Sequence, residues 1–430
     1  MTDHFRVPSI SSPLAAAIQP PGSKSITNRA LVCAALAQGP SRLNGTLASE
    51  DTLVMIQSLR KLGVSIEPGP AGTTLTVSPA KPIETRHELD LDVANSGTTI
   101  RFLAALLATQ PGHYRLDGTD RMRERPAQDL LDALGQLGVR GESTHGNGCP
   151  PIVIDTEGLP GGKAQIRGDI SSQFLSGLLM AAPFAQSTVT LQLDTPLVSV
   201  PYVTMTERVM EAFGVHVTHP TDTAYQVETG QAYQGATYNI EPDASAASYF
   251  WAAAAIAGGH VTVQGLTRDA LQGDVAFCEC LRVMGCGVQY MADGIKVTGG
   301  SLQGVTVDMN TISDTVQTLA VVALFADGPT TITNVAHIRH KESDRIGDLA
   351  RELRKLGGTI HEHEDGLTIE PATLHPAEIE TYQDHRMAMS LALAGLRVDG
   401  VMIKDPGCTE KTYPGFFTDL QSVLTQQAAG

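Results

Sequence analysis

The segment SKSITNRALVCAALA, residues 23–37, has the pattern of a buried α-helix, and the fold can be worked out from its recurrence. Ser23 is a typical helix N-cap, and beyond Arg29 the segment is almost wholly apolar. Each later copy also opens on Ser, Asn or Asp and continues in Ala and Leu, which predicts six buried helices. The copies follow at intervals of 70 to 74 residues: NSGTTIRFLAALLA from Asn95, DISSQFLSGLLMAA from Asp169, DASAASYFWAAAAIA from Asp243, SDTVQTLAVVALFA from Ser313 and DHRMAMSLALAGL from Asp384.

A second repeated element is a helical stretch that ends in Leu-Gly-Val or a close variant, with a strand-like segment after it. We expect its glycine to end the helix. The five copies are SLRKLGVSI, ALGQLGVR, VMEAFGVHV, CLRVMGCGV and ELRKLGGTI, and FFTDLQSVL near the C-terminus fits a sixth copy cut short. The chain is therefore predicted to hold six β/α modules of about 70 residues, which is too long for a solenoid repeat and indicates globular α/β domains.

Composition excludes several classes of function. The net charge of −16, without any Lys/Arg-rich run, argues against nucleic-acid binding. Neither an 18-residue apolar run nor a signal-peptide pattern is present, so no membrane partner is expected. Six cysteines without a CxxC pair indicate reduced thiols in the cytoplasm. HEHED (361–365) fits the edge and turn of a hairpin better than a metal site, and we expect no metal.

The helix starts are candidates for an anion-binding surface. Buried helices expose unsatisfied N–H groups at their N-termini, and these attract anions such as phosphate. If the repeat brings the six starts together, the polar residues there form a shared site; the alternative is that each only caps its own helix. The candidates are Lys24, Ser25, Arg29, Asn95, Gly97, Thr98, Arg101, Ser171, Ser172, Gln173, Asp314, His385 and Arg386.

Three further cationic stretches add to these candidates. RMRERP places Arg125 just before a helix predicted from Ala127. HIRHKESDRIGDL (337–349) is predicted to place Lys341 and Arg345 on one face of a helical turn, with Glu342 beside them. DPGCTEKTYPGF carries Lys411 in a loop rich in Pro and Gly. On spacing alone, each could instead be a solvated surface charge.

Seven motifs, in this order and spacing, resemble the 5-enolpyruvylshikimate-3-phosphate (EPSP) synthase family from about Gln19 to Phe417: PGSKSITNRALVCAALA, NSGTTIRF, RMRERP, GDISSQFLSGLLMAAP, HKESDRIGDL, TYQDHRMAMSLAL and DPGCTEKTYP. The resemblance implies an inside-out α/β barrel fold with two similar domains, each of three βαβαββ modules. It implies that residues 22–240 form a lower domain on the shikimate 3-phosphate side. Residues 1–21 with 241–430 would form the upper domain, which carries the catalytic Asp and Glu and part of the phosphoenolpyruvate clamp.

The resemblance also implies a reaction. The enolpyruvyl group of phosphoenolpyruvate would pass to the 5-hydroxyl of shikimate 3-phosphate, releasing phosphate, as the sixth step of chorismate synthesis and without a metal or organic cofactor. The implied inhibitor is glyphosate, for which Gly97 leaves room, although Phe102 stands where many members have Pro. We expect a cytoplasmic monomer.

Motif matches assign the residues. Shikimate 3-phosphate would contact Lys24, Ser25, Arg29, Ser171, Ser172, Gln173, Ser199, Tyr202, Asp314 and Lys341. Phosphoenolpyruvate would contact Lys24, Gly97, Arg125, Gln173, Arg345, Arg386 and Lys411. Asp314 matches the base at the 5-hydroxyl, and Glu342 matches the acid. Lys24 is the alternative acid, because adjacent cations lower the pKa of a carboxyl. His337 stands where better-studied members often have Asn.

Rival interpretations predict other residues. The sister enzyme that transfers enolpyruvate to UDP-N-acetylglucosamine typically has Lys-Asn in place of Lys24-Ser25, and a Cys in the loop before Arg125; residues 113–126 contain none. RNA-cyclase relatives that share the module would show a basic surface and a catalytic His motif. A non-catalytic anion-binding repeat protein would need no combination of Asp314, Glu342 and scattered cations.

Overall fold

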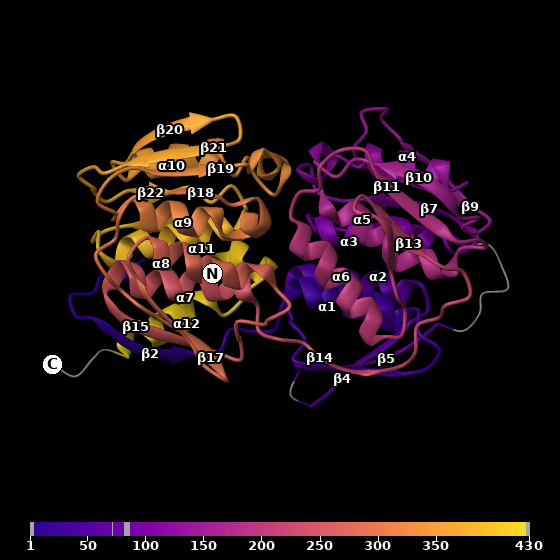
Figure 1. The fold of residues 1–430 in the computed structure, drawn as a ribbon, viewed down its shortest axis with the longest axis horizontal. Helices are drawn as coiled ribbons and strands as arrows, with labels where there is room; N and C mark the ends of the chain where they lie inside the picture. The colour runs from indigo at the N-terminus through magenta and orange to yellow at the C-terminus, as the bar shows by residue number, and fades with distance from the viewer. Residues whose placement is uncertain (1–3, 71, 81–86, 427–430) are drawn as a thin grey trace. The chain divides into compact units, whose positions relative to one another are not determined.

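The computed structural model describes residues 4–70, 72–80 and 87–426, and the chain divides into two compact units (Figure 1). The middle unit is Gly22–Ile240, and the terminal unit combines Met1–Pro21 with Glu241–Gly430. The chain therefore passes from one unit to the other twice. Within the described ranges, no helix has the length and apolar character needed to cross a membrane.

The middle unit contains three four-stranded sheets of one design. Their strands are β3 (Ser41–Asn44), β4 (Ser65–Pro68), β5 (Thr74–Ser78), β6 (His87–Asp92), β7 (Gly112–Asp117), β8 (Arg140–Ser143), β9 (Ile152–Thr156), β10 (Gly162–Ile166), β11 (Val189–Leu193), β12 (Thr218–Thr221), β13 (Ala224–Val227) and β14 (Thr237–Asn239). The strand orders are β14–β3–β5–β4, β6–β7–β9–β8 and β10–β11–β13–β12. In each sheet the first pair is parallel and the other two are antiparallel, as a repeated module requires.

The terminal unit repeats this design with one variation. Its strands are β1 (His4–Arg6), β2 (Leu14–Ile18), β15 (Gly259–Gln264), β16 (Gly287–Tyr290), β17 (Gly294–Thr298), β18 (Thr306–Asp308), β19 (Thr330–Thr333), β20 (Thr359–His363), β21 (Gly366–Glu370), β22 (Glu378–Ile379) and β23 (Met402–Lys404). Two sheets have four strands, β2–β15–β17–β16 and β18–β19–β21–β20, and the third has three, β22–β23–β1. Within the described residues, the sixth module has no two-stranded hairpin of its own, and β1 pairs antiparallel with β23 in its place.

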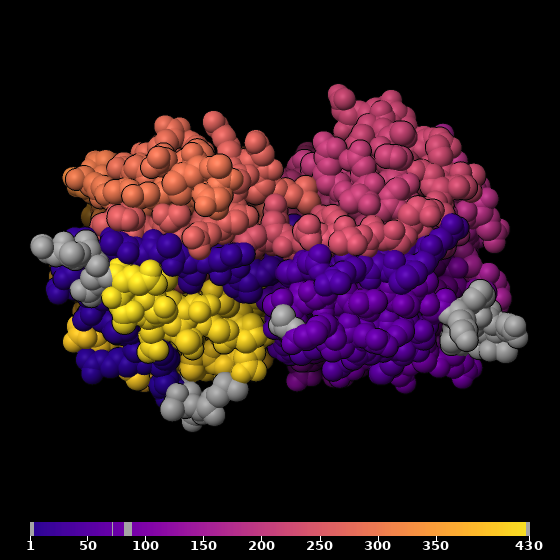
Figure 2. Space-filling model, turned by 90° about the horizontal axis from the view of Figure 1, so that it is seen from below, coloured from indigo at the N-terminus to yellow at the C-terminus, as the bar shows by residue number. Residues whose placement is uncertain are grey.

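The N-terminal segment therefore completes two modules of the terminal unit. Its strand β2 lies parallel to β15, and the backbone N–H of Ala15 donates to the carbonyl of Gln426 at 2.9 Å. Figure 2 shows this indigo segment beside the yellow C-terminal part of the chain. The α/β periodicity predicts the modules but carries no signal for this exchange of strands.

Each unit has helices at its centre and sheets outside, which is the inside-out α/β arrangement (Figure 1). The central helices are α1 (Lys24–Ala35), α3 (Gly97–Leu107), α5 (Ser172–Ala181), α7 (Ala244–Ala257), α9 (Val316–Ala323) and α11 (His385–Ala392). Every residue of α3, α7, α9 and α11 is buried, as their apolar sequences predict. The more amphipathic helices are α2 (Glu50–Lys61), α4 (Gln128–Gln136), α6 (Val200–Ala212), α8 (Phe277–Val283), α10 (Gly347–Lys355) and α12 (Phe416–Thr425).

The predicted helix starts are right for three of the six central helices. Ser23, Asp243 and Asp384 cap α1, α7 and α11. The caps of α3 and α5 are Ser96 and Ser171, not Asn95 and Asp169, because these serine hydroxyls lie closer to the helix and accept the N–H groups of Thr99 and Gln173. In the fifth copy Ser313 lies within a 3₁₀ segment, η4 (Asn310–Thr315), and α9 begins only after it.

The helices of the Leu-Gly-Val motifs end one residue earlier than predicted. The C-cap is the residue before glycine, for example Leu62 before Gly63. The glycines that follow α2, α4, α6, α8 and α10 have φ between 86° and 109°, which L-residues rarely adopt. The predicted hairpin over HEHED is confirmed as β20 and β21, and α12 is the predicted short sixth helix.

These glycines generate a stability prediction. Gly63→Ala should lower the free energy of unfolding by roughly 1 kcal/mol, because residue 63 must keep φ at 86°. Gly135→Ala, inside α4 with open space around its Cβ, should raise it by about 0.5–1 kcal/mol. Urea denaturation measures both, and a Gly63→Ala protein as stable as wild type would contradict the assignment.

Candidate functional site

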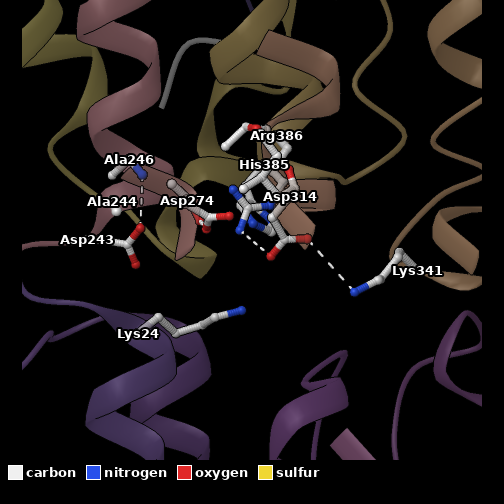
Figure 3. A network of polar contacts seen from close by, with 12 residues as sticks. Lys24, Asp243, Ala244, Ala246, Asp274, Asp314, Lys341, His385 and Arg386 are labelled. Carbon is white, nitrogen blue, oxygen red and sulfur yellow. Dashed lines mark hydrogen bonds and ion pairs between the residues drawn. The ribbon is translucent and has the colours of Figure 1, made fainter. Parts of the chain in front are cut away.

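The terminal unit brings three cations to one carboxylate, Asp314, and Figure 3 shows two of them, Arg386 and Lys341, beside it. Arg386 Nη2 lies 2.8 Å from Asp314 Oδ2, whereas Arg345 Nη1 and Lys341 Nζ lie 3.2 and 3.8 Å from Oδ1. Asp314 belongs to η4, Arg386 is the second residue of α11, and the other two precede α10. Predicted residues up to 72 positions apart thus meet within one unit.

Arg345 is the most completely buried of these cations, at 1% exposure. Its Nε donates to Asp384 Oδ2 at 2.7 Å, and its Nη2 donates to Glu342 Oε2 at 2.9 Å. Burial by itself lowers the pKa of an arginine, but Asp384, Glu342 and Asp314 together hold the pKa of Arg345 above its ordinary value. The side chain is therefore a permanent positive charge in a fixed position.

The prediction that Lys341 and Arg345 share a helical turn is wrong. The 3₁₀ segment η5 (Ala336–His340) ends before them, Lys341 has an extended backbone, and α10 starts only at Gly347. Asp344 accounts for this, because its carboxylate accepts the N–H groups of Ile346 and Gly347 and so fixes the start of α10. Both cations still reach Asp314 from this irregular segment.

Other polar side chains surround this group. Arg386 Nη1 donates to the Tyr249 hydroxyl at 3.4 Å, and burial raises the pKa of that hydroxyl to about 12. Lys411 is 5% exposed at the end of η7 (Pro406–Lys411), which packs against α11. His337 lies in η5, where burial, with Lys341 and His340, lowers its pKa to about 3 against an opposing effect of Asp314.

The middle unit has a buried cation of its own, Arg29, at 1% exposure. Its Nε donates to Thr206 Oγ1 at 2.7 Å, and its other donors reach the carbonyls of Ser25 and Tyr202 at 2.9 and 3.0 Å. Burial lowers the pKa of Arg29 to about 10, so it remains charged at neutral pH. Arg29 thus holds the backbone of two predicted site residues, Ser25 and Tyr202.

A second network in the middle unit links α3 with α5. Arg101 Nη1 donates to Gln173 Oε1 at 2.6 Å, and Gln173 Nε2 donates to Thr98 Oγ1 at 3.2 Å. Ser171, next to Gln173, caps α5 by accepting the N–H of Gln173, and Ser172 is 5% exposed. These five predicted polar residues therefore lie at the caps or within the first two turns of two helices that pack against each other.

Arg125 lies against the start of α3. Its Nη1 donates to the carbonyl of Asn95 at 3.0 Å, and a Cβ added to Gly97 would stand 2.2 Å from its Nη2. Glycine at position 97 is therefore what lets this guanidinium lie over the helix N-terminus. On α1, Lys24 Nζ lies 3.4 Å from Asp51 Oδ2, and both residues are buried.

Backbone strain marks the same segments. Among the described residues, the non-glycine residues with positive φ are Ala94, Ser199, Asn334, Tyr382, Gln383 and Asp405. Each lies within three residues of the first residue of α3, α6, η5, α11 or η7, and every one of these elements carries or adjoins a predicted site residue. Strained backbone of this kind clusters at functional sites. Ser199 is itself a predicted contact, with φ of 53° and 4% exposure.

Several supporting residues were missed at the sequence level. Asp384 was recognised only as a cap, although its carboxylate also holds Arg345 and Ser343. Asp51, Tyr249 and Thr206 lack any sequence signal, since each meets its partner only through packing. One sequence clue was available and it applied to Asp384, which stands at a helix start directly before His385 and Arg386.

His337 generates a pH prediction. Its pKa in the folded protein, about 3, lies below the ordinary 6.5, so the unfolded chain binds more protons between those values. Stability from this residue is fully present above pH 6.5 and falls by up to about 1.4 kcal/mol per pH unit below it. Between pH 7 and pH 5, the His337→Asn variant should therefore lose less stability than wild type. The control variant His361→Asn, at an exposed position of β20, should lose as much stability as wild type. Equal slopes for His337→Asn and wild type in urea titrations would contradict the burial of a neutral imidazole.

Comparison with known proteins places these observations in a family. The family model described as EPSP synthase (3-phosphoshikimate 1-carboxyvinyltransferase) matches residues 8–420. The chain is 46% identical over 425 residues to the 3-phosphoshikimate 1-carboxyvinyltransferase of Nostoc punctiforme, covering 99% of this chain and 100% of that one. It is 46% identical to the chloroplastic enzyme of Brassica napus, covering 94% and 82%. An EPSP synthase structure from Acinetobacter baumannii superposes with a TM-score of 0.80 at 27% identity, covering 98% of both chains. With this match added to the repeated modules and the buried cations, the chain belongs to the EPSP synthase family.

Proposed function

We propose that the protein transfers the enolpyruvyl group of phosphoenolpyruvate to the 5-hydroxyl of shikimate 3-phosphate, releasing phosphate. Family membership supports the reaction, and one observation within the chain supports it most directly. Arg345, Arg386 and Lys341 converge on Asp314, so three cationic hydrogen-bond donors adjoin a single candidate base. Both substrates are phosphorylated carboxylates, which such a cluster binds by charge-assisted hydrogen bonds.

The proposed steps balance in protons and bonds. Asp314 takes the proton of the 5-hydroxyl while the oxygen bonds to the central carbon of phosphoenolpyruvate and an acid protonates its methylene carbon. The resulting tetrahedral intermediate then loses a methyl proton and phosphate, which restores the double bond. Arg345, Arg386 and Lys411 hold the phosphoenolpyruvate, with Lys24, Gly97, Arg125 and Gln173 contributing from the middle unit.

Two residues remain candidates for the acid. Glu342 accepts a hydrogen bond from Arg345 at 2.9 Å, and a guanidinium favours the ionised carboxylate, which is the form of a base. To donate a proton, Glu342 must first be protonated, and the adjacent guanidinium opposes this. Lys24 is the alternative, since its ammonium group carries a proton beside Asp51. We retain both as candidates for the acid, Glu342 because of the family resemblance and Lys24 because of its ammonium group.

The shikimate 3-phosphate contacts are proposed for polar groups at helix starts in the middle unit, together with Asp314 and Lys341. Those groups are Lys24, Ser25, Arg29, Ser171, Ser172, Gln173, Ser199 and Tyr202. Arg29 also holds the backbones of Ser25 and Tyr202 by hydrogen bonds to their carbonyls. We further propose that the protein acts as a monomer in the cytoplasm and that glyphosate competes with phosphoenolpyruvate.

The reaction is tested by phosphate release from phosphoenolpyruvate with and without shikimate 3-phosphate. Wild type should release phosphate only with both substrates. Asp314→Asn should lower kcat by about 10²–10⁴-fold, the usual contribution of a general base. Asp293→Asn, an exposed carboxylate near β17, is the control and should stay active. Release that requires UDP-N-acetylglucosamine, or an Asp314→Asn enzyme with wild-type kcat, would contradict the proposal.

Gly97 provides a separate test of the phosphoenolpyruvate and glyphosate assignments. Gly97→Ala places a methyl group against Arg125, so the guanidinium must move, and KM for phosphoenolpyruvate should rise about tenfold, or about 1.4 kcal/mol. The glyphosate concentration for half inhibition should rise by a larger factor. Gly135→Ala in α4 is the matched glycine control. Wild-type enzyme that resists glyphosate while binding phosphoenolpyruvate normally would overturn the assignment.

A further inference from the structure

The turn before α11 has an unusual backbone for its sequence. The N–H of Asp384 donates to the carbonyl of Thr381 at 2.8 Å, and the two residues between them, Tyr382 and Gln383, have φ of 54° and 55°. Two consecutive positive φ values are the pattern of a type I′ turn, which Gly, Asn and Asp dominate. Tyr and Gln are disfavoured in both places, so surrounding contacts must hold the turn.

Those contacts come from α10. The Glu352 side chain is completely buried, and its Oε1 accepts the Tyr382 hydroxyl at 2.6 Å. Its Oε2 accepts the backbone N–H of Glu380 at 3.0 Å, so one carboxylate holds the turn by side chain and by main chain. Arg351 adds to the hold, because its Nη1 donates to the Tyr382 hydroxyl at 3.1 Å and its guanidinium lies 5.7 Å from the ring centroid.

The turn formed by residues 381–384 sets the position of Asp384. Asp384 Oδ1 accepts the N–H of Arg386 at 2.9 Å, which fixes the first turn of α11. The same carboxylate accepts Arg345 Nε at 2.7 Å and Nη2 at 3.1 Å. Arg345 and Arg386, the two arginines of the terminal unit that are assigned to phosphoenolpyruvate, therefore depend on Asp384. Asp384 itself depends on a turn whose residues disfavour its backbone conformation.

We propose that Glu352 and Tyr382 are positioning residues for the phosphoenolpyruvate arginines. They touch no substrate; they hold the strained turn 381–384 so that Asp384 keeps Arg345 and Arg386 in place. The inference rests on the proposed function for the identity of the anion. The positioning role does not depend on that identity, because the binding of any phosphate by Arg345 and Arg386 should require Glu352 and Tyr382 in the same way.

The decisive variant is Tyr382→Phe, which removes only the hydroxyl that joins Glu352 and Arg351. KM for phosphoenolpyruvate should rise about tenfold, whereas KM for shikimate 3-phosphate should change less than twofold. Tyr290→Phe is the matched control, because its hydroxyl donates to Glu279 at 2.8 Å and Arg268 lies 5.3 Å from its ring centroid. Tyr290 belongs to the sheet β2–β15–β17–β16, which carries no predicted site residue.

A second substitution separates positioning from a general loss of stability. Gln383→Gly supplies a residue that adopts positive φ without cost, so the turn should need less support. In Tyr382→Phe combined with Gln383→Gly, KM for phosphoenolpyruvate should return to within threefold of wild type. A role confined to folding would instead lower stability and leave KM unchanged in Tyr382→Phe.

A readout without turnover keeps the inference independent of the reaction. Inorganic phosphate should raise the melting temperature of wild type, and Tyr382→Phe should need about tenfold more phosphate for the same rise. If wild type proved inactive, the proposed function would be refuted, but the phosphate dependence of the melting temperature could still be compared between wild type and Tyr382→Phe. Equal phosphate dependence in the two proteins, an equal rise in both KM values, or a failure of Gln383→Gly to restore KM would overturn the positioning role.

Discussion

Burial of the Arg345 guanidinium is the constraint on which the terminal unit depends. A charge at 1% exposure must be compensated within the protein, and three carboxylates, Asp314, Glu342 and Asp384, do so. Such pairs add little net stability, but removing one partner typically costs about 3–5 kcal/mol. Their value here is geometric. Because Asp384 also caps α11, the same carboxylate places Arg386, and the cations of the unit are fixed relative to one another.

The middle unit also buries a guanidinium, that of Arg29, but surrounds it with neutral groups. Arg29 is surrounded by hydroxyls and carbonyls, with the Phe102 ring 5.1 Å away, and no carboxylate is among its described hydrogen-bond partners. The corresponding turns of α7, α9 and α11 carry Ser248, Thr318 and Ser390, whose hydroxyls form a chain at 3.1 and 3.2 Å. The repeat is thus preserved in backbone and differs between the units in its buried polar side chains, with Arg29 in the middle unit and this chain of hydroxyls in the terminal unit.

Much of the fold was predictable because it depends on local signals. Apolar helices at intervals of 70 to 74 residues and glycines after helices are short-range features, and the structure confirms the elements that they predict. The predictions that were wrong or missing concern positions where two side chains compete for the same backbone groups, or contacts between residues far apart in the sequence. Ser96 and Ser171 displaced neighbouring caps, and the Asp344 carboxylate stopped a helix from forming over 341–345. Contacts such as Arg386 with Tyr249, 137 residues apart, have no local signature.

The strained residues explain why the site was harder to predict than the fold. Asn is tolerated at positive φ, but Ala94, Tyr382 and Gln383 favour other conformations, so their local sequence argues against the backbone they adopt. Only packing can supply the missing free energy, as Glu352 does for Tyr382. The geometry of these strained segments therefore depends on contacts with the rest of the unit as well as on their local sequence. Sequence motifs can identify such residues, whereas their mutual placement is a property of the packed unit.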